Sequence, residues 1–248
     1  MADGYSPHAL PPLPPPLAAA FEAATSGGGK RERTQSALVR AAVQVFCARG
    51  VAAATVQEVA QVAGMTAGTV YNHFASKEAL VERVAVVLAE SLSRAIGDSQ
   101  EEVVDGAERV AIGLRRYVLL AAESPAWALL MLEVAASTPS LLQQIEVYPL
   151  GDLRLGVRQK RLKFPSEAVA LDLLEGMGTY AMRRVATGQA PGRHDVAVAT
   201  LALRALGMAA DEAAEIAKRP LPELPMPQPR PPARPARKRA PAKRSGER

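Results

Sequence analysis

Cysteine and aromatic residues are scarce in this chain of 248 residues. It has a single cysteine, Cys47, and ten Phe, Trp and Tyr residues. With no second thiol, an internal disulfide is excluded and nothing requires an oxidising compartment, so we expect a cytoplasmic protein. With so few rings, any core must consist mainly of Ala, Val and Leu, which favours packed helices over sandwiches of short strands. Cys47 lies in an apolar helical run, where we favour a small buried side chain over a redox sensor.

A long apolar run is missing as well. The richest stretch, residues 118–136, contains Glu123, Pro125 and Glu133, which excludes a membrane span. The first twenty residues have no basic region and hold several prolines, so a secretory signal is not expected. The sequence shows no metal-ligand spacing, no phosphate-binding glycine loop and no set of nucleophile, base and orienting group. We therefore expect no metal, no cofactor and no enzymatic activity.

Proline and positive charge are concentrated at the ends of the chain. Residues 1–29 combine a proline cluster with Ala and Gly, which predicts a disordered leader. Residues 219–248 hold nine prolines, which predicts a disordered tail. From Lys218 to Arg248, ten Lys or Arg stand against two Glu, a net charge of +8. Two roles remain open for this tail: solubility and, as we prefer, a sequence-independent tether to DNA.

Start and stop signals for helices are clear in residues 30–96. The apolar pattern predicts a first helix that ends at Gly50 and a second that begins after Thr55 and ends at Gly64. Thr66 can cap a short third helix, and Ser76 can cap a fourth that extends to about residue 96. Two short helices around a tight turn, with another helix as support, predict a helix-turn-helix unit.

The third of these helices carries an unusual polar set within the stretch GMTAGTVYNHFASKEAL, residues 64–80. Val70 and Phe74 are four apart and predict an inward face. The outward residues suit DNA: we expect phosphate contacts from Tyr71, His73 and Lys77, and base-edge contacts from Thr66, Ala67 and Asn72. The alternative is that the aromatic residues fill a small core. We accept that alternative for Phe74 and favour DNA contact for the others.

Residues 33–80, above all TVQEVAQVAGMTAGTVYNHFASKEAL, resemble the DNA-binding domain of the TetR/AcrR family of bacterial transcription regulators. The resemblance implies phosphate contacts by Tyr71, His73 and Lys77. It also places four consecutive residues and Asn72 in the major groove. These four residues are Thr66, Ala67, Gly68 and Thr69.

Helical periodicity continues through residues 97–218. It predicts helices over about 103–118, 166–187 and 194–206, helix starts at Ser124-Pro125 and Thr138-Pro139, and a short helix from Asp211. The resemblance implies that this half binds a small-molecule inducer. It also implies a homodimer whose four-helix interface is formed by residues 166–188 and 193–206.

An effector pocket in this half would draw on its few aromatic and methionine side chains. The candidates are Trp127, Leu130, Met131, Met177 and Tyr180. For each of them taken alone we favour ordinary core packing over ligand contact.

The expected fold is all-α. It comprises a leader at 1–29, a helix-turn-helix domain at 30–80, a connecting helix at 76–96, a ligand-binding and dimerisation domain at 97–218, and a tail at 219–248. We predict a ligand-responsive repressor that binds a near-palindromic DNA operator as a homodimer. The alternative is a helical small-molecule-binding protein or enzyme with an incidental DNA-binding unit. The operator bases, the effector and the regulated genes are not encoded in these patterns.

Overall fold

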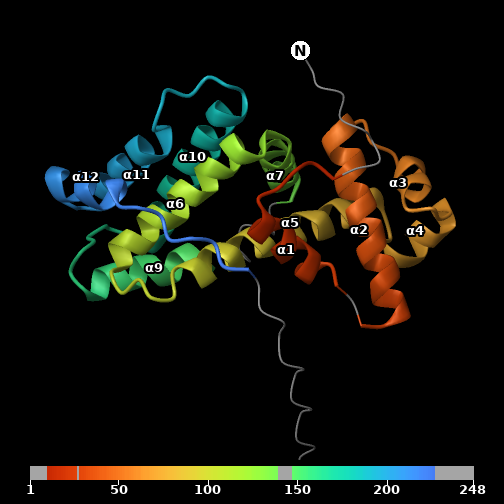
Figure 1. Cartoon of the computed structure of the whole chain (residues 1–248), viewed down its shortest axis with the longest axis horizontal. Coiled ribbons are helices and arrows are strands. Elements are labelled where there is room, and N and C mark those ends of the chain that lie inside the picture. The colour runs from red at the N-terminus through yellow and green to blue at the C-terminus, as the bar shows by residue number, and fades with distance from the viewer. Residues whose placement is uncertain (1–9, 27, 139–146, 227–248) are drawn as a thin grey trace, which may run out of the picture.

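The computed structural model describes residues 10–26, 28–138 and 147–226. Helices are the only regular elements in these ranges, which confirms the all-α expectation. Two groups of helices are joined by the long helix α5, Lys77–Ser99, which begins in one group and ends against the other (Figure 1). No helix in the described ranges is both long enough and apolar enough to cross a membrane.

The first group has the helices expected from the capping signals. It comprises α2 (Lys30–Arg49), α3 (Val56–Val62), α4 (Ala67–His73) and the first half of α5. The start of α5 is fixed by Ser76, whose hydroxyl accepts a hydrogen bond from Ala79 N at 3.2 Å. The apolar faces of α2, α3, α4 and α5 meet in one core cluster, to which α7 (Pro125–Ser137) contributes Trp127, Leu130 and Val134.

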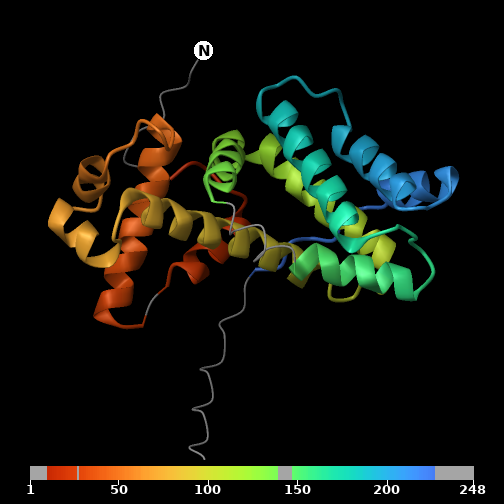
Figure 2. The ribbon, with the colours of Figure 1, turned by 180° about the vertical axis from the view of Figure 1, so that it is seen from behind.

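The second group is arranged around α6, Gly106–Glu123, which packs against four other helices of the group. Those neighbours are α9 (Val147–Arg158), α10 (Glu167–Ala186), α11 (His194–Ala205) and α12 (Ala210–Lys218). A Cβ added to Gly106 would lie 2.3 Å from the backbone nitrogen of Gly156, so the contact between α6 and α9 leaves no room for a side chain there. Figure 2, seen from behind, shows α10 in front of α6 with α11 beside it.

Most predicted helices of this half are confirmed, with shifted ends. The helix expected from 103 begins at Gly106, because Asp105 accepts a hydrogen bond from Ala107 N at 2.9 Å and caps it. The helical spacing of Arg154, Arg158 and Arg161 indicated a helix in the region of α9, but its bounds were not predicted. Thr138 ends α7, and the remainder of the predicted start at Thr138-Pro139 lies outside the described residues.

The prediction of a disordered leader is wrong for its described part. Helix α1, Pro15–Ala24, lies at the junction of the two groups against α5 (Figure 1). Its prolines occupy the first turn, where a missing N–H costs no hydrogen bond, and Leu17, Ala20 and Phe21 form a buried face. Proline content therefore marked a helix start here. Residues 1–9 lie outside the described part.

The prediction of a disordered tail is likewise wrong for residues 219–226. This segment runs without helix from the end of α12 back along α6 towards the junction (Figure 1). Arg115 Nη1 donates to the carbonyl of Arg219 at 2.7 Å, Arg116 donates to the carbonyl of Pro222, and Leu224 packs on the cluster at the junction. The basic residues from 227 onward lie outside the described part.

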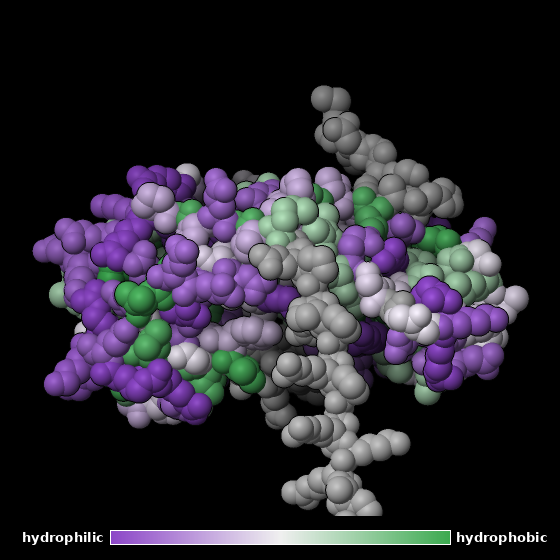
Figure 3. All heavy atoms as spheres, turned by 60° about the horizontal axis from the view of Figure 1, so that its bottom comes forward, coloured by the Kyte–Doolittle hydropathy of each residue, from purple (hydrophilic) through white to green (hydrophobic). Residues whose placement is uncertain are grey.

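An ion pair ties α6 to α11 within the second group. Arg115 Nε lies 2.8 Å from Asp195 Oδ2, and both side chains are only about a tenth exposed. The face of the molecule seen in Figure 3 is mainly hydrophilic, and apolar residues appear on it as separate patches. Because each charge of the Arg115–Asp195 pair has its partner, the cost of burying it is offset.

Candidate DNA-binding surface and effector pocket

The helix-turn-helix begins with a capping box at α3. Thr55 N donates to Glu58 Oε2 at 2.9 Å, and Glu58 N donates to Thr55 Oγ1 at 3.2 Å. The hydrogen bonds from Thr55 hold the pKa of the Glu58 carboxyl below its usual value, because they stabilise its charged form. The predicted Thr-x-x-Glu signal is confirmed.

The turn between α3 and α4 depends on a left-handed residue. Gly64 has φ +66°, and an added Cβ would meet nothing within 4 Å, so the backbone conformation, and not a lack of space, favours glycine. Met65 N donates to Ala60 O at 2.8 Å and closes the turn. Thr66 then caps α4 by accepting from Thr69 N at 3.2 Å, as expected.

Helix α4 buries one face and presents the other. Val70 is 1% exposed and Phe74, just after the helix, is 5% exposed, so the structural role of Phe74 is confirmed. Of the predicted DNA-contacting residues, Tyr71 is 52% exposed. Thr66, Gly68 and Asn72 are also exposed, whereas Ala67 and Thr69 are half-buried. The structure thus brings these predicted residues together around one short helix.

Two of the predicted phosphate contacts, Lys77 and His73, are placed differently. Lys77, the first residue of α5, donates from Nζ to the carbonyl oxygen of Ala52 at 3.0 Å, which holds its ammonium group beside the turn between α2 and α3. His73 is half-buried, and its Nδ1 is shielded from solvent with no partner in the described part of the chain. Any DNA contact by His73 therefore falls to Nε2.

Sequence reasoning missed a carboxylate that reaches this turn from α7. Glu133 Oε1 accepts hydrogen bonds from Val51 N at 2.8 Å and from Ala52 N at 3.4 Å. Val51 and Ala52 are 82 and 81 residues away in the sequence. The available signal was a lone acidic residue within the apolar helix PAWALLMLEVAAS. Because Lys77 bonds to the carbonyl of Ala52, this one residue connects α7 to the start of α5.

Cys47 lies beside this link as an unreactive thiol. Its Sγ is 3.8 Å from the carbonyl oxygen of Ala126. Desolvation, with a smaller contribution from the nearby Glu133 carboxylate, raises the pKa of the thiol to about 12. A thiol that remains protonated at neutral pH is a poor nucleophile, which favours the packing interpretation over the redox sensor.

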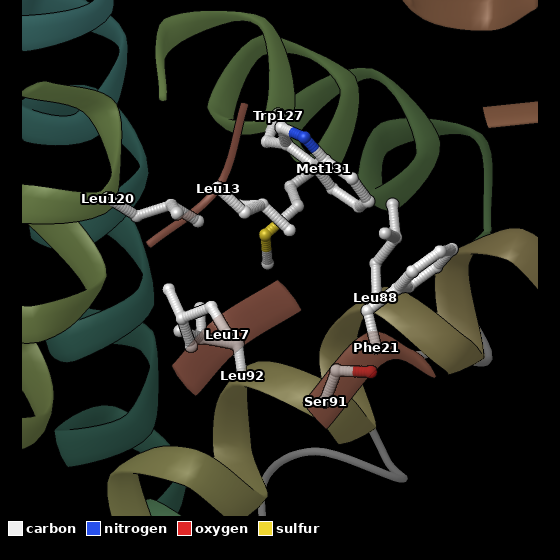
Figure 4. A pocket seen from close by; sticks show the side chains of 9 residues that line it. All are labelled: Leu13, Leu17, Phe21, Leu88, Ser91, Leu92, Leu120, Trp127 and Met131. Atoms are coloured by element: carbon white, nitrogen blue, oxygen red, sulfur yellow. The ribbon is translucent and has the colours of Figure 1, made fainter. Parts of the chain in front are cut away.

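An apolar pocket lies at the junction of the two helix groups (Figure 4). Trp127 and Met131 of α7 face Leu88 and Leu92 of α5, and Leu120 of α6 closes one side. The remaining side is formed by residues from α1 and the segment just before it. The cavity left between them is about 20 Å³, which is room for roughly one water molecule.

The five predicted pocket residues do not come together in this way. Trp127 and Met131 line the pocket, whereas Leu130 is 2% exposed in the core shared with α2 to α5. Met177 packs on the core of the second group, and Tyr180 is 77% exposed. Met177 and Tyr180 therefore do not line this pocket, because helical spacing alone does not show which neighbour each face of α10 meets.

Tyr180 belongs instead to an apolar surface on α10 and α11. Val169 and Tyr180 are 54% and 77% exposed on α10, and Leu201 is 55% exposed on the adjacent α11. Leu173 and Met177, which are half-buried, continue the same face of α10 at spacings of four. We refer to Val169, Leu173, Met177, Tyr180 and Leu201 as the α10–α11 face.

Within the described ranges, no group of three or more His, Cys, Asp or Glu side chains is arranged to hold a metal ion. The described residues form one exposed polar helix surface, one small apolar pocket and one exposed apolar helix face, which are features suited to recognition.

Comparisons with known proteins agree in both halves. The family model described as "Bacterial regulatory proteins, tetR family" matches residues 38–84, and "Tetracyclin repressor-like, C-terminal domain" matches residues 105–219. The transcriptional regulator TtgR of Pseudomonas putida is 28% identical over 175 residues, which cover 69% of this chain and 75% of TtgR. The solved structure of RolR with the ligand resorcinol is 30% identical, with a TM-score of 0.68, over 79% of this chain and 98% of RolR. RolR without ligand is also similar, at 27% identity and a TM-score of 0.63 over 77% of this chain and 100% of RolR.

Proposed function

This chain belongs to the TetR family of bacterial transcriptional regulators, and from that premise we propose that it acts as a homodimer on a near-palindromic operator. As a member of this family it is a DNA-binding repressor that responds to a ligand. The observation that carries the proposal is the geometry of α4. It buries Val70 and Phe74, which lies just beyond its end, and leaves Thr66, Tyr71 and Asn72 exposed.

The exposed face of α4 fits a major groove. The amide of Asn72 can pair with adenine, and the hydroxyl of Thr66 can reach a base edge or a phosphate. At Gly68, an added Cβ would make only an ordinary contact of 3.7 Å with Thr66 Oγ1, so the fold does not require glycine there. The bare backbone at Gly68 instead supports a close approach to DNA.

Phosphate contacts fall to side chains at the rim of this face. Tyr71 carries its hydroxyl on an exposed ring. Lys77 uses one of its three N–H donors on Ala52 O, which leaves about two for phosphate oxygens. Because that bond also restrains the side chain, Lys77 loses less entropy when it contacts DNA.

Dimerisation would cover the α10–α11 face. Large apolar side chains as exposed as Val169, Tyr180 and Leu201 on adjacent helices are typical of an interaction surface. A two-fold axis at this face brings two copies of α10 and α11 into a four-helix contact. A near-palindromic operator requires that this dimer present its two α4 helices to major grooves roughly 34–36 Å apart.

The effector would bind at the junction pocket. Its lining helices α5, α6 and α7 connect the two helix groups, and α7 also carries Glu133 to the turn beside Lys77. The resorcinol complex of RolR supports a small-molecule ligand for a chain of this shape. If effector and operator favour different arrangements, each must weaken the other's binding by the same factor.

The DNA test begins with selection of bound fragments from the source genome, followed by mobility-shift titration at several salt concentrations. We expect Lys77→Met to reduce affinity and to lower the slope of log K against log salt by about 0.9, because one phosphate contact is lost. Arg158→Met, at an exposed position on α9, is the matched control and should leave the slope unchanged. Failure of the wild-type protein to prefer any duplex at moderate salt would refute the proposal.

The dimer test uses sedimentation of the same protein. Leu201→Glu places a charge on the α10–α11 face and should shift the protein towards monomer. The same variant should bind a full operator much more weakly than the wild type. A wild-type protein that sediments as a monomer, or a Leu201→Glu variant that remains a dimer, would contradict this interface.

A further inference from the structure

Residues 10–25 form an addition to the two matched family regions. The family models begin at residues 38 and 105, so neither includes α1 or the segment before it. Yet this part of the chain is packed at the junction of the two helix groups (Figures 1 and 2). We refer to residues 10–25 as the strap.

The strap is fastened to α7 by two hydrogen bonds. Trp127 Nε1 donates to the carbonyl oxygen of Pro11 at 2.8 Å, and Ser124 Oγ donates to the carbonyl oxygen of Pro12 at 2.6 Å. Ser124 stands at the N-cap of α7, but its side chain makes no cap hydrogen bond. Its hydroxyl therefore serves the contact with the strap in place of the usual capping role.

Three apolar side chains of the strap fill the pocket. Leu13 lies beside Met131, and Leu17 and Phe21 line the pocket from α1 (Figure 4). The rings of Phe21 and Trp127 lie with centroids 5.0 Å apart at an interplanar angle of 77°, an edge-to-face contact. Leu17 and Phe21 are 5% and 2% exposed. The strap thus occupies the volume that an apolar ligand would need.

The strap also touches the DNA-binding group. Arg40 of α2 pairs with Glu22 at 2.6 Å and donates to Thr25 Oγ1 at 3.1 Å. Surface pairs of this kind contribute little stability. They nevertheless connect a change in the strap to the helix that supports α3 and α4.

We propose that the strap is a built-in occupant of the effector pocket and that an uncharged apolar effector enters by displacing Leu13, Leu17 and Phe21. This inference rests on the proposed function, because it assumes that the junction pocket is the effector site. With the strap docked, about 20 Å³ remains, so no ligand larger than roughly one water molecule can enter without moving it.

The lining sets the chemical class of the effector. Its side chains are Leu, Phe, Trp and Met apart from Ser91, whose hydroxyl already donates to Val87 O at 2.6 Å. A charged ligand would lose its hydration there without gaining a partner. An aromatic or aliphatic molecule with few polar groups regains the contacts that the strap gives up.

The experiment exploits Trp127, the single tryptophan of the chain, as a reporter at the strap. Acrylamide quenching of its fluorescence is measured without probe, and binding of the uncharged fluorophore phenylnaphthylamine is then titrated. Leu17→Asp should detach the strap, raise the quenching of Trp127 and tighten probe binding by about tenfold if the wild-type pocket is open about a tenth of the time. Ala23→Asp adds the same charge on the exposed side of α1 and should leave both readouts unchanged.

Two further variants keep the result decisive. Leu203→Ala destabilises a core remote from the strap. If this variant also binds the probe tightly, the effect of Leu17→Asp comes from a general loosening of the fold, and the inference is overturned. Should circular dichroism show that Leu17→Asp is unfolded, Leu13→Ala decides, because it removes only one half-buried side chain of the strap. Unchanged quenching and probe affinity in a folded strap variant would overturn the inference. Operator binding by the same wild-type protein is scored separately, so a failed strap and a failed regulator give different results.

Discussion

Replacing Glu133 by Ala should loosen the contact between α7 and the turn that follows α2. The bond from Val51 N to the carboxylate is 2.8 Å long, whereas that from Ala52 N is 3.4 Å, so the first contributes most. A hydrogen bond to a charged acceptor contributes about 1.5–3 kcal/mol. Val51 is only 7% exposed, so water is a poor substitute for the lost acceptor. We expect the free energy of unfolding to fall by about 2 kcal/mol.

The loss should also reach the DNA-binding surface. Ala52 O accepts from Lys77 Nζ, so a displaced turn releases the lysine that we assign to a phosphate contact. We expect operator affinity to fall by up to about tenfold, which corresponds to about 1.4 kcal/mol. Glu133→Gln retains an uncharged acceptor of the same shape and should lose roughly half as much stability.

Urea denaturation followed by circular dichroism at one fixed protein concentration measures the first effect, and mobility shift measures the second. The fixed concentration matters because the unfolding of a dimer depends on it. If the free energy of unfolding of Glu133→Ala lies within about 0.5 kcal/mol of the wild-type value, the hydrogen bonds of this carboxylate do not stabilise the contact between α7 and the turn. If stability falls and operator affinity does not, the stabilising role of Glu133 stands, and only the proposed effect of Ala52 on Lys77 is refuted.

Three other predictions follow from the contacts above. Burial raises the pKa of Cys47 to about 12, so at pH 8 the folded protein should react with a disulfide reagent far more slowly than the urea-unfolded chain, and equal rates would contradict a buried thiol. Arg115→Met leaves Asp195 buried without its partner and should lower the free energy of unfolding by about 3–5 kcal/mol, whereas a cost below about 1 kcal/mol would show that the pair is solvated. Removing residues 227–248, which hold eight Lys or Arg, keeps the contacts of Pro222 and Leu224 and tests the DNA tether. The slope of log K against log salt should fall by about 0.9 for each lost phosphate contact, and an unchanged slope would contradict the tether.

The helix-turn-helix was predictable because its signals are local. Thr55 and Glu58, and likewise Thr66 and Thr69, are three residues apart and cap a helix end through hydrogen bonds within that spacing. Gly64 marks a turn because glycine, which has no Cβ, adopts the left-handed backbone conformation without strain. The outward position of Tyr71 and the inward position of Phe74 then follow from helical periodicity.

The pocket was not predictable in this way. Trp127 is paired with Pro11 and Phe21, more than one hundred residues earlier in the chain, and composition alone suggested that this earlier segment had no structure. Tyr180 looked like a pocket residue because it is aromatic, but its side of α10 faces away from the junction and towards solvent. Nothing in the spacing of either residue encodes its partner.

By itself, then, the sequence determined most of the helices after residue 30, the caps of the helix-turn-helix and the polar face of α4, because those depend on interactions between residues a few positions apart. Only the tertiary structure decided that Glu133 reaches the turn beside Lys77 and that the strap fills the junction pocket. Both depend on which helices pack together, and that choice is made by the combined burial of many apolar side chains from distant parts of the chain.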